Sequence, residues 1–373
     1  MSSVLRDLPE PNFIERDAQQ IVSELIAEYE NLTGKTLYPA QVERLWINLI
    51  AYRESQVRIG IQEAAKQNLV RYASKPVLDY LGEPLGVYRL DPQSATTTLR
   101  FILDEPLETS FLIPLGTQIE DNSGTVTFST DGDVTLKPGE ISVDVSATCE
   151  ESGEIGNGWQ PGQISAFVES FDIDLSVSNI AVTANGFDEE DDERLRERIM
   201  LAPESFSTAG PKAAYIFWAK STHQSIIDVA VLRPKPGSVA LYLLTESGLA
   251  DENLCKQVYA VCSDEERRPL CDSVIVKSTE EINYSIDAIL VPYAGTNAES
   301  VKADAAISAA AFTKNIRSKQ GRDVVLDQLK NALIVPGVKK VVLNDPLTDI
   351  DIDINETAFC QSVKIEIGEA EDE

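Results

Sequence analysis

The stretch Asn185–Ala219, which reads NGFDEEDDERLRERIMLAPESFSTAGPKAAYIFWA, constrains the fold more than any other part of the chain. A turn signal at Asn185-Gly186 leads into an acidic helix start, a basic helix body and a proline. We expect Asp188 to be the N-cap, because an aspartate there accepts backbone N–H groups and complements the helix dipole. Pro203 should end this helix, and Pro211 suits the first position of the next one. The stretch therefore predicts two well-capped helices at a structural junction.

The charges of this stretch follow an acid-before-base order. Glu190–Arg194 and Asp192–Arg196 are pairs at i,i+4 spacing, which support a helix and are typical of a solvated face. A metal or phosphate site is the alternative interpretation. The acidic residues are too dense in sequence to converge on one ion, and no glycine-rich loop accompanies them.

Composition limits the possible partners. The 373 residues allow two or three domains, and 32 basic against 61 acidic residues give a net charge of −29. This charge argues against binding to nucleic acid or to an anionic membrane surface. We expect no membrane insertion, because the chain has neither a signal-peptide pattern nor a run of about 18 apolar residues. The five cysteines form no CxxC pair, and we expect free thiols in a reducing compartment.

Residues 1–85 are predicted to be helical. A first helix carries Ile21, Leu25, Tyr29 and Leu32 on one face and ends at Gly34. A second helix should open at Pro39 and run to about Tyr72. One side of this helix carries Val42, Trp46, Leu49, Arg53, Val57 and Ile61. So short a segment cannot bury this face alone, so later domains or another chain must cover it. We expect a partner interface there, with Trp46 as its anchor.

The rest of the chain predicts three further domains and an α+β multidomain class. Residues 86–185 alternate apolar and polar side chains between turn signals, which indicates a β-rich middle domain. Residues 186–278 and 279–373 each alternate strands and helices, which predicts two small C-terminal α+β sandwich domains.

None of the possible catalytic or ligand sites is convincing, and we expect no catalytic, metal or cofactor-binding residues. His223 is the only histidine and fits a helix C-terminus. Asp349, Asp351 and Asp353 lack the glycine and glutamate of a calcium loop, so their alternation predicts a strand with an acidic face. The glycines of residues 153–158 fit a turn-rich connection better than a phosphate loop. A carboxylate pair remains a possible hydrolytic site, although no aromatic-rich groove accompanies it.

Several local patterns resemble the baseplate J-like family. They are Leu78-Asp79-Tyr80-Leu81-Gly82 with Gly86-Val87, Ile113–Thr117, Phe128–Thr130, Gly153–Asn157, the DDERLRERI to AGPKAAYIFWA stretch, Pro236-Gly237, Arg268–Asp272, Val335–Val338 and Asn344–Pro346. These patterns follow one another in the order typical of the family and extend over nearly the whole chain. One departure is Cys271, where the family often has glycine, and this affects a turn only.

The resemblance implies a non-enzymatic baseplate wedge protein of a contractile phage tail or a related injection particle. Such a protein would assemble with copies of itself and with a second wedge protein into a six-fold ring around the hub. The ring would connect to the sheath, with the sheath-initiator and hub proteins as neighbours. The chain would be made in the bacterial host cytoplasm and reside in the tail baseplate. Two other classes stay open at this point, a carbohydrate-binding tail or adhesin module and a carboxylate-dependent hydrolase.

Overall fold

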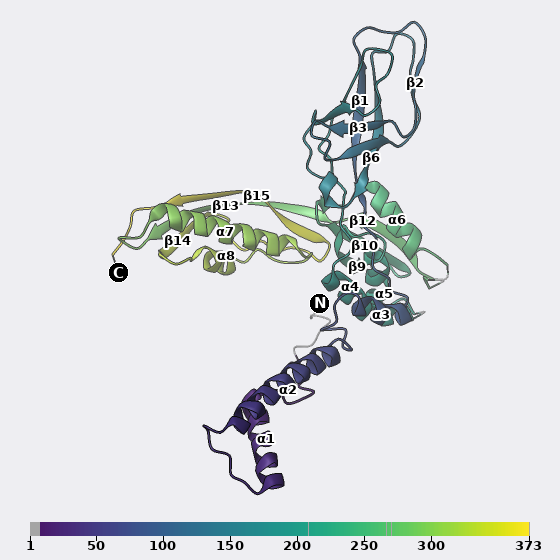
Figure 1. The fold of residues 1–373 in the computed structure, drawn as a ribbon. Helices are drawn as coiled ribbons and strands as arrows, with labels where there is room; N and C mark the ends of the chain where they lie inside the picture. Colours follow the sequence, from purple (N-terminus) through teal and green to yellow (C-terminus); the bar gives the residue numbers. More distant parts are fainter. Residues whose placement is uncertain (1–7, 208, 266, 270, 373) are drawn as a thin grey trace. The chain divides into compact units, whose positions relative to one another are not determined.

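A computed structural model describes residues 8–207, 209–265, 267–269 and 271–372 (Figure 1). It divides the chain into two compact units. The first unit comprises the residues up to Arg89 together with Asp191–Pro203, and the second comprises Leu90–Glu190 and Glu204–Glu373. The α+β multidomain class is confirmed, with helices at the N-terminus, a β-rich middle and mixed C-terminal domains.

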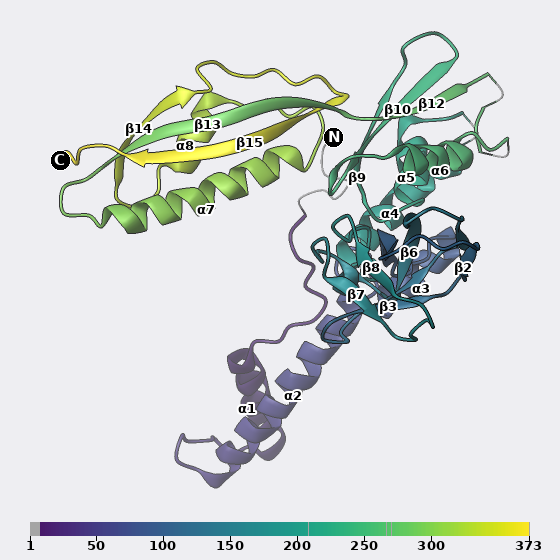
Figure 2. The same ribbon diagram turned by 90° about the horizontal axis from the view of Figure 1, so that it is seen from above.

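The first unit is helical. Helix α1 (Ala18–Thr33) begins at the cap Asp17, whose Oδ1 accepts the N–H of Gln19 at 2.7 Å, and ends at Gly34 with φ of 69°. Helix α2 (Val42–Lys66) lies beside α1 (Figures 1 and 2). It is shorter at both ends than the predicted span from Pro39 to Tyr72, since turns replace the helix after Lys66. Helix α3 (Val77–Gly82), a 3-10 turn (Glu83–Leu85) and most of α4 (Asp192–Ser205) complete the unit.

Two predictions about α4 are wrong. We assigned it to the domain that begins at residue 186, whereas residues 191–203 pack with the N-terminal helical unit. Pro203 lies inside the helix, which continues to Ser205. A proline this close to a helix end removes only one N–H, so the remaining turn survives.

The β-domain is a six-stranded sheet in the order β7-β3-β4-β6-β1-β8. The strands are β1 (Ser94–Leu103), β3 (Gln118–Asp121), β4 (Thr127–Thr130), β6 (Ser142–Ser152), β7 (Ile164–Phe167) and β8 (Leu175–Asn179), with β2 (Phe111–Ile113) and β5 (Val134–Leu136) as a separate pair. Alternate residues enter one core, which includes Leu99, Phe101 and Phe128. The buried Asn179 side chain links the two end strands, because its Oδ1 accepts the N–H of Ile164 at 3.0 Å.

The next domain begins with α5 (Lys212–Lys220). Its sheet places β10 (Ser238–Thr245) between antiparallel β9 (Ile226–Leu232) and parallel β12 (Ser273–Ser278), with short β11 (Gly248–Leu249) also on β10. Helix α6 (Glu252–Cys262) provides the crossover between the parallel strands and begins at the cap Asp251.

The C-terminal domain has a three-stranded sheet in the order β14-β13-β15 (Figure 2). The elements are β13 (Glu280–Pro292), α7 (Ala298–Arg317), α8 (Leu326–Leu333), β14 (Val338–Asp345) and β15 (Glu356–Ile367). Both helices cover the same face of the sheet, where Ile286, Ala305 and Leu329 share one core. No helix in the described part of the chain has the length and apolar character that a membrane span requires.

The predicted acidic strand at Asp349–Asp353 is wrong, because this segment is an irregular connection with a single bridge between Ile350 and Val324. Its alternation has another cause: Ile352 is buried in the domain core, and the Asp349 carboxylate accepts the first N–H of α8, from Leu326, at 2.8 Å.

Candidate assembly surfaces

Helix α2 carries two apolar faces. Its inner face, with Ile47 and Ala51, is buried within the N-terminal unit. Gln62 on the same face binds the segment before α1, since its Nε2 donates to the carbonyl of Pro11 at 2.7 Å and its Oε1 accepts the N–H of Phe13 at 2.9 Å. These contacts fix which side of α2 is available to other molecules.

The outer face of α2 consists of the six residues named from the sequence, Val42, Trp46, Leu49, Arg53, Val57 and Ile61, and all of them are exposed. Trp46 is 62% exposed and Val42 is 65% exposed. The sequence analysis missed Leu45, Ile50, Tyr52 and Ile59, which are also exposed and widen the apolar surface beyond one stripe. Exposed apolar surface of this width indicates an interaction site, so we expect a partner to cover it.

A charged cluster joins α3 to α4 within the same unit. The guanidinium of Arg89 donates to Asp79 at 2.8 Å and to Asp192 at 2.7 Å. Burial alone would lower the pKa of Arg89, but these hydrogen bonds outweigh burial and raise it above its usual range. Burial would likewise raise the pKa of the Asp192 carboxyl, and the hydrogen bond from Arg89 and the backbone N–H of Lys75 lower it. Asp192 therefore stays ionised and ties α4 to the preceding helices.

Two of the three basic residues of α4, Arg196 and Arg198, are buried, which corrects the prediction of a solvated face. Arg196 is 7% exposed and Arg198 is 5% exposed. Arg196 donates to the carbonyl oxygens of Val70 at 2.8 Å and Ala73 at 2.7 Å, and Arg198 donates to the carbonyl of Tyr88 at 3.1 Å. These side chains satisfy backbone carbonyls in the connection after α2 and in the segment after the 3-10 turn, where no regular secondary structure does so.

Both predictions about the helix starts are off by one or a few residues. Asp188 is not the cap of α4, because the helix begins four residues later, and its Oδ1 accepts the N–H of Glu154 at 2.9 Å instead. Asp191 takes the capping role, with its Oδ1 accepting the N–H of Arg194 at 2.9 Å. Pro211 is the N-cap of α5 rather than its first residue, with φ of −63° and ψ of 153°. Thr208, another possible cap there, lies outside the described residues.

Replacing Asp191 by alanine should lower the free energy of unfolding of the N-terminal unit by about 1 kcal/mol, because one helix N–H loses its acceptor. Asp191→Asn should be close to neutral, since the amide oxygen can accept the same N–H. Urea denaturation followed by helical circular dichroism measures both variants. Equal stability of the alanine and aspartate chains would show that Asp191 does not cap α4.

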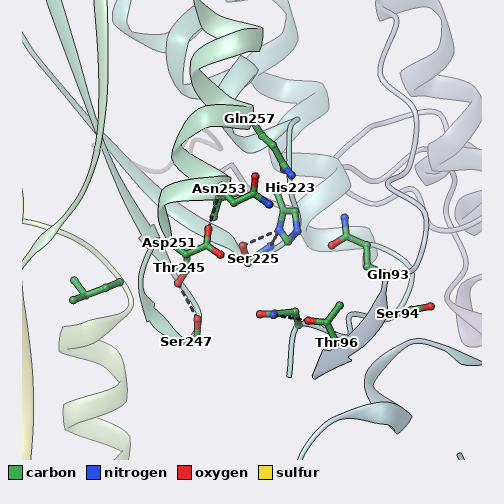
Figure 3. Close-up of a pocket in the computed structure, with 13 residues that line it drawn as sticks. Gln93, Ser94, Thr96, His223, Ser225, Thr245, Ser247, Asp251, Asn253 and Gln257 are labelled. Carbon is green, nitrogen blue, oxygen red and sulfur yellow. Dashed lines mark hydrogen bonds between the residues drawn. The ribbon is translucent and has the colours of Figure 1, made fainter. Parts of the chain in front are cut away.

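A polar cavity of about 360 Å³ lies in the second unit (Figure 3). Gln93, Ser94, Thr96 and Asn185 of the β-domain line it together with residues of the following domain, including His223, Ser225, Thr245 and Asp251. None of its lining residues is phenylalanine, tyrosine or tryptophan, so it offers no aromatic platform for a sugar ring.

His223 lies three residues beyond α5 rather than at its C-terminal residue, and its contacts explain its presence. The ring Nδ1 accepts the backbone N–H of Ser225 at 3.1 Å and lies 2.8 Å from its Oγ, and the ring packs edge-on against Phe187. Asp251, the carboxylate of the same cavity, accepts the N–H of Leu254 as the cap of α6. A histidine that orders its own turn and an aspartate that caps a helix are structural roles, and we assign no catalytic role to them.

Other sites weighed from the sequence also have structural explanations. The described residues contain no group of three or more His, Cys, Asp or Glu side chains arranged for a metal ion. In the glycine-rich loop, a Cβ on Gly156 would lie 2.8 Å from the Cβ of Ala95 and 2.9 Å from the Sγ of Cys149. The loop therefore needs glycine for close packing against the β-domain core. All five cysteines are free thiols in this structure.

Comparison with known proteins connects these domains to one family. Residues 98–186 match the baseplate J-like protein barrel domain, residues 207–278 the baseplate J-like central domain, and residues 284–366 the baseplate J-like protein C-terminal domain. These three matches follow one another along the chain in the order of the β-rich and mixed domains described above.

One curated relative and one solved structure complete the comparison. The chain is 33% identical to baseplate protein J of Escherichia phage P2 over 181 residues, which are 48% of this chain and 60% of that protein. The structure of the anti-feeding prophage baseplate, determined by cryo-electron microscopy, contains a similar chain with a TM-score of 0.49 and 13% identity, covering 92% of this chain and 90% of that one. On the strength of the three domain matches and the phage relative, the chain belongs to the baseplate J-like family.

Proposed function

We propose that this protein is a structural wedge subunit in the baseplate of a contractile phage tail or a related injection particle. The match of three consecutive domains to three domains of one baseplate family supports this proposal. The protein's task in this role is binding to other subunits, which requires large surfaces and no reaction centre. The capping and packing roles of its aspartates, histidine and glycine loop agree with such a task.

The proposed partners are copies of the same chain and a second wedge protein, which together form a six-fold ring around the hub. Contacts to the sheath-initiator and hub proteins would link the ring to the rest of the tail. We place the contact with the second wedge protein on the outer face of α2, because Val42, Trp46 and Val57 remain more than half exposed after the inner face is covered by the chain itself. Burial of apolar surface contributes about 25 cal/mol per Å², so covering this face would favour binding.

Electron microscopy of particles that carry a tagged form of this subunit tests the assignment. We expect tag density on the baseplate at six symmetry-related positions, and particles made without the subunit should lack a complete baseplate. Tag density on fibres, or glycan-dependent binding of the isolated chain to cells, would point instead to an adhesin.

A further inference from the structure

Strand β14 lies at an edge of the C-terminal sheet (Figure 2). It pairs with β13 on one side, from Val338 to Asp345, and with no described strand on the other. An edge strand presents a row of backbone N–H and C=O groups that another extended segment can pair with. The free side of β14 is therefore a template for one additional strand.

A groove follows this free edge. Helix α8 packs beside β14, and a groove of about 280 Å³ lies between them. Leu326 and Lys330 of α8 line one side, and residues 340–343 of β14 line the other, with Leu347 beyond the strand end. Leu347 is 75% exposed and Val342 is also exposed, so the groove offers apolar contacts as well as backbone groups. An extended peptide can add to an exposed sheet edge, with main-chain hydrogen bonds giving affinity and side-chain pockets beside the strand giving specificity.

The charge of the groove indicates which kind of segment it can bind. Lys330 and Lys340 are its only charged lining residues, in a chain whose net charge is −29. Two other lysines of the same domain have carboxylate neighbours: Lys339 lies 3.3 Å from Glu371, and Lys364 lies 2.9 Å from Glu366. Neither Lys330 nor Lys340 forms an ion pair with a described residue. Two cations on opposite walls of the groove complement an acidic segment placed between them.

A lysine on an edge strand also protects a protein against unwanted strand pairing. This role accounts for Lys340, but it leaves Lys330 on the helix and the exposed Leu347 without explanation. We propose that an extended, acidic segment of a partner protein adds to β14 as a fourth strand in the groove between α8 and β14. The two lysines of the groove favour an acidic occupant, which we take to be a segment of a different protein, and the test below distinguishes it from a second copy of this chain. This site belongs to the C-terminal domain and does not depend on the outer face of α2.

The experiment measures binding of a fluorescent peptide of alternating glutamate and valine to the full-length chain by anisotropy. We expect binding that weakens with added salt, because exposed ion pairs are screened. Lys330→Glu combined with Lys340→Glu should weaken binding about tenfold, since two attractions become repulsions. Lys302→Glu is the matched control, an exposed lysine on α7 outside the groove, and it should bind like the unchanged chain.

Two further peptides separate strand addition from simple charge attraction. A peptide of the same sequence with alternate backbone nitrogens methylated should lose binding, because it cannot donate its share of the ladder hydrogen bonds. A lysine–valine peptide should not bind. The proposal fails if the acidic peptide does not bind, if the double variant binds as well as the control, or if methylation has no effect. It also fails if the chain forms a dimer that the double variant abolishes, because the occupant would then be a second copy.

Discussion

Deleting residues 1–66 should leave a folded protein that no longer co-purifies with the second wedge protein. The deletion removes α1 and α2, and with them the outer face that carries Trp46. The cut lies at Lys66, the last residue of α2. Residues 67–75 must stay, because the carbonyls of Val70 and Ala73 accept hydrogen bonds from the buried Arg196.

The single substitution Trp46→Asp should weaken the same association at least about 30-fold, since an aromatic anchor at an interface contributes about 2 kcal/mol or more. The stability of the isolated chain should change little, because Trp46 is 62% exposed there. Tyr259→Asp is the matched control, an aromatic residue that is 49% exposed on α6. Co-purification and thermal denaturation of both variants separate an interface effect from a folding effect.

Two outcomes would contradict this assignment. If the chain without residues 1–66 still enters complete baseplates, the partner binds elsewhere, and the C-terminal domains become the candidates. If the shortened chain aggregates although its other domains are intact, α1 and α2 protect the chain itself rather than bind a partner.

Replacing Arg196 by methionine should lower the free energy of unfolding of the N-terminal unit by about 3 kcal/mol. Methionine fills a similar volume but leaves the carbonyls of Val70 and Ala73 without their donor, and each buried unsatisfied group costs about 1–3 kcal/mol. Arg196→Lys should recover only part of this loss, because an ammonium lacks the planar fork that reaches two carbonyls. Urea denaturation followed by helical circular dichroism is the measurement.

Glu193→Gln is the control for the charge of Arg196. Glu193 forms an ion pair with Arg196 but its side chain is 85% exposed, so its removal should change stability by less than about 1 kcal/mol. If Glu193→Gln and Arg196→Met had equal effects, the surface ion pair rather than the backbone contacts would hold α4 in place.

Local sequence patterns determined most of the secondary structure. The sequence patterns predict strands at Ser238–Leu244 and Ile282–Val291 and an alanine-rich helix at Ala298–Ile316, and β10, β13 and α7 match these ranges within a few residues. Apolar residues recur every 2 residues in a strand and every 3.6 residues in a helix, because only the side chains on one face of the element are buried away from water. The residues of the outer face of α2 could also be predicted one by one. Helical spacing places them on one side of the helix, and two helices alone cannot cover that side.

The start of α4 was predicted too early for a physical reason. Six consecutive acidic residues follow Phe187, and every one of them is a plausible cap or first-turn residue by its chemistry. The backbone bridge between Phe187 and Gln93 and the hydrogen bond that the Glu154 N–H donates to the Asp188 carboxylate hold the chain extended past Asp188. These partners are far away in the sequence, so no local pattern could reveal them.

Tertiary structure alone decided how the charged residues of α4 and the edges of the C-terminal sheet are used. Arg196 and Arg198 occupy helix positions that are typical of a solvated face, and they are buried because distant carbonyls without regular partners accept their N–H groups. Lys330 and Lys340 are ordinary lysines in the sequence, and they line one groove only because α8 packs beside β14. Periodicity records which faces of a segment avoid water, whereas the pairing of distant segments determines where each unsatisfied hydrogen-bonding group and each charge is placed.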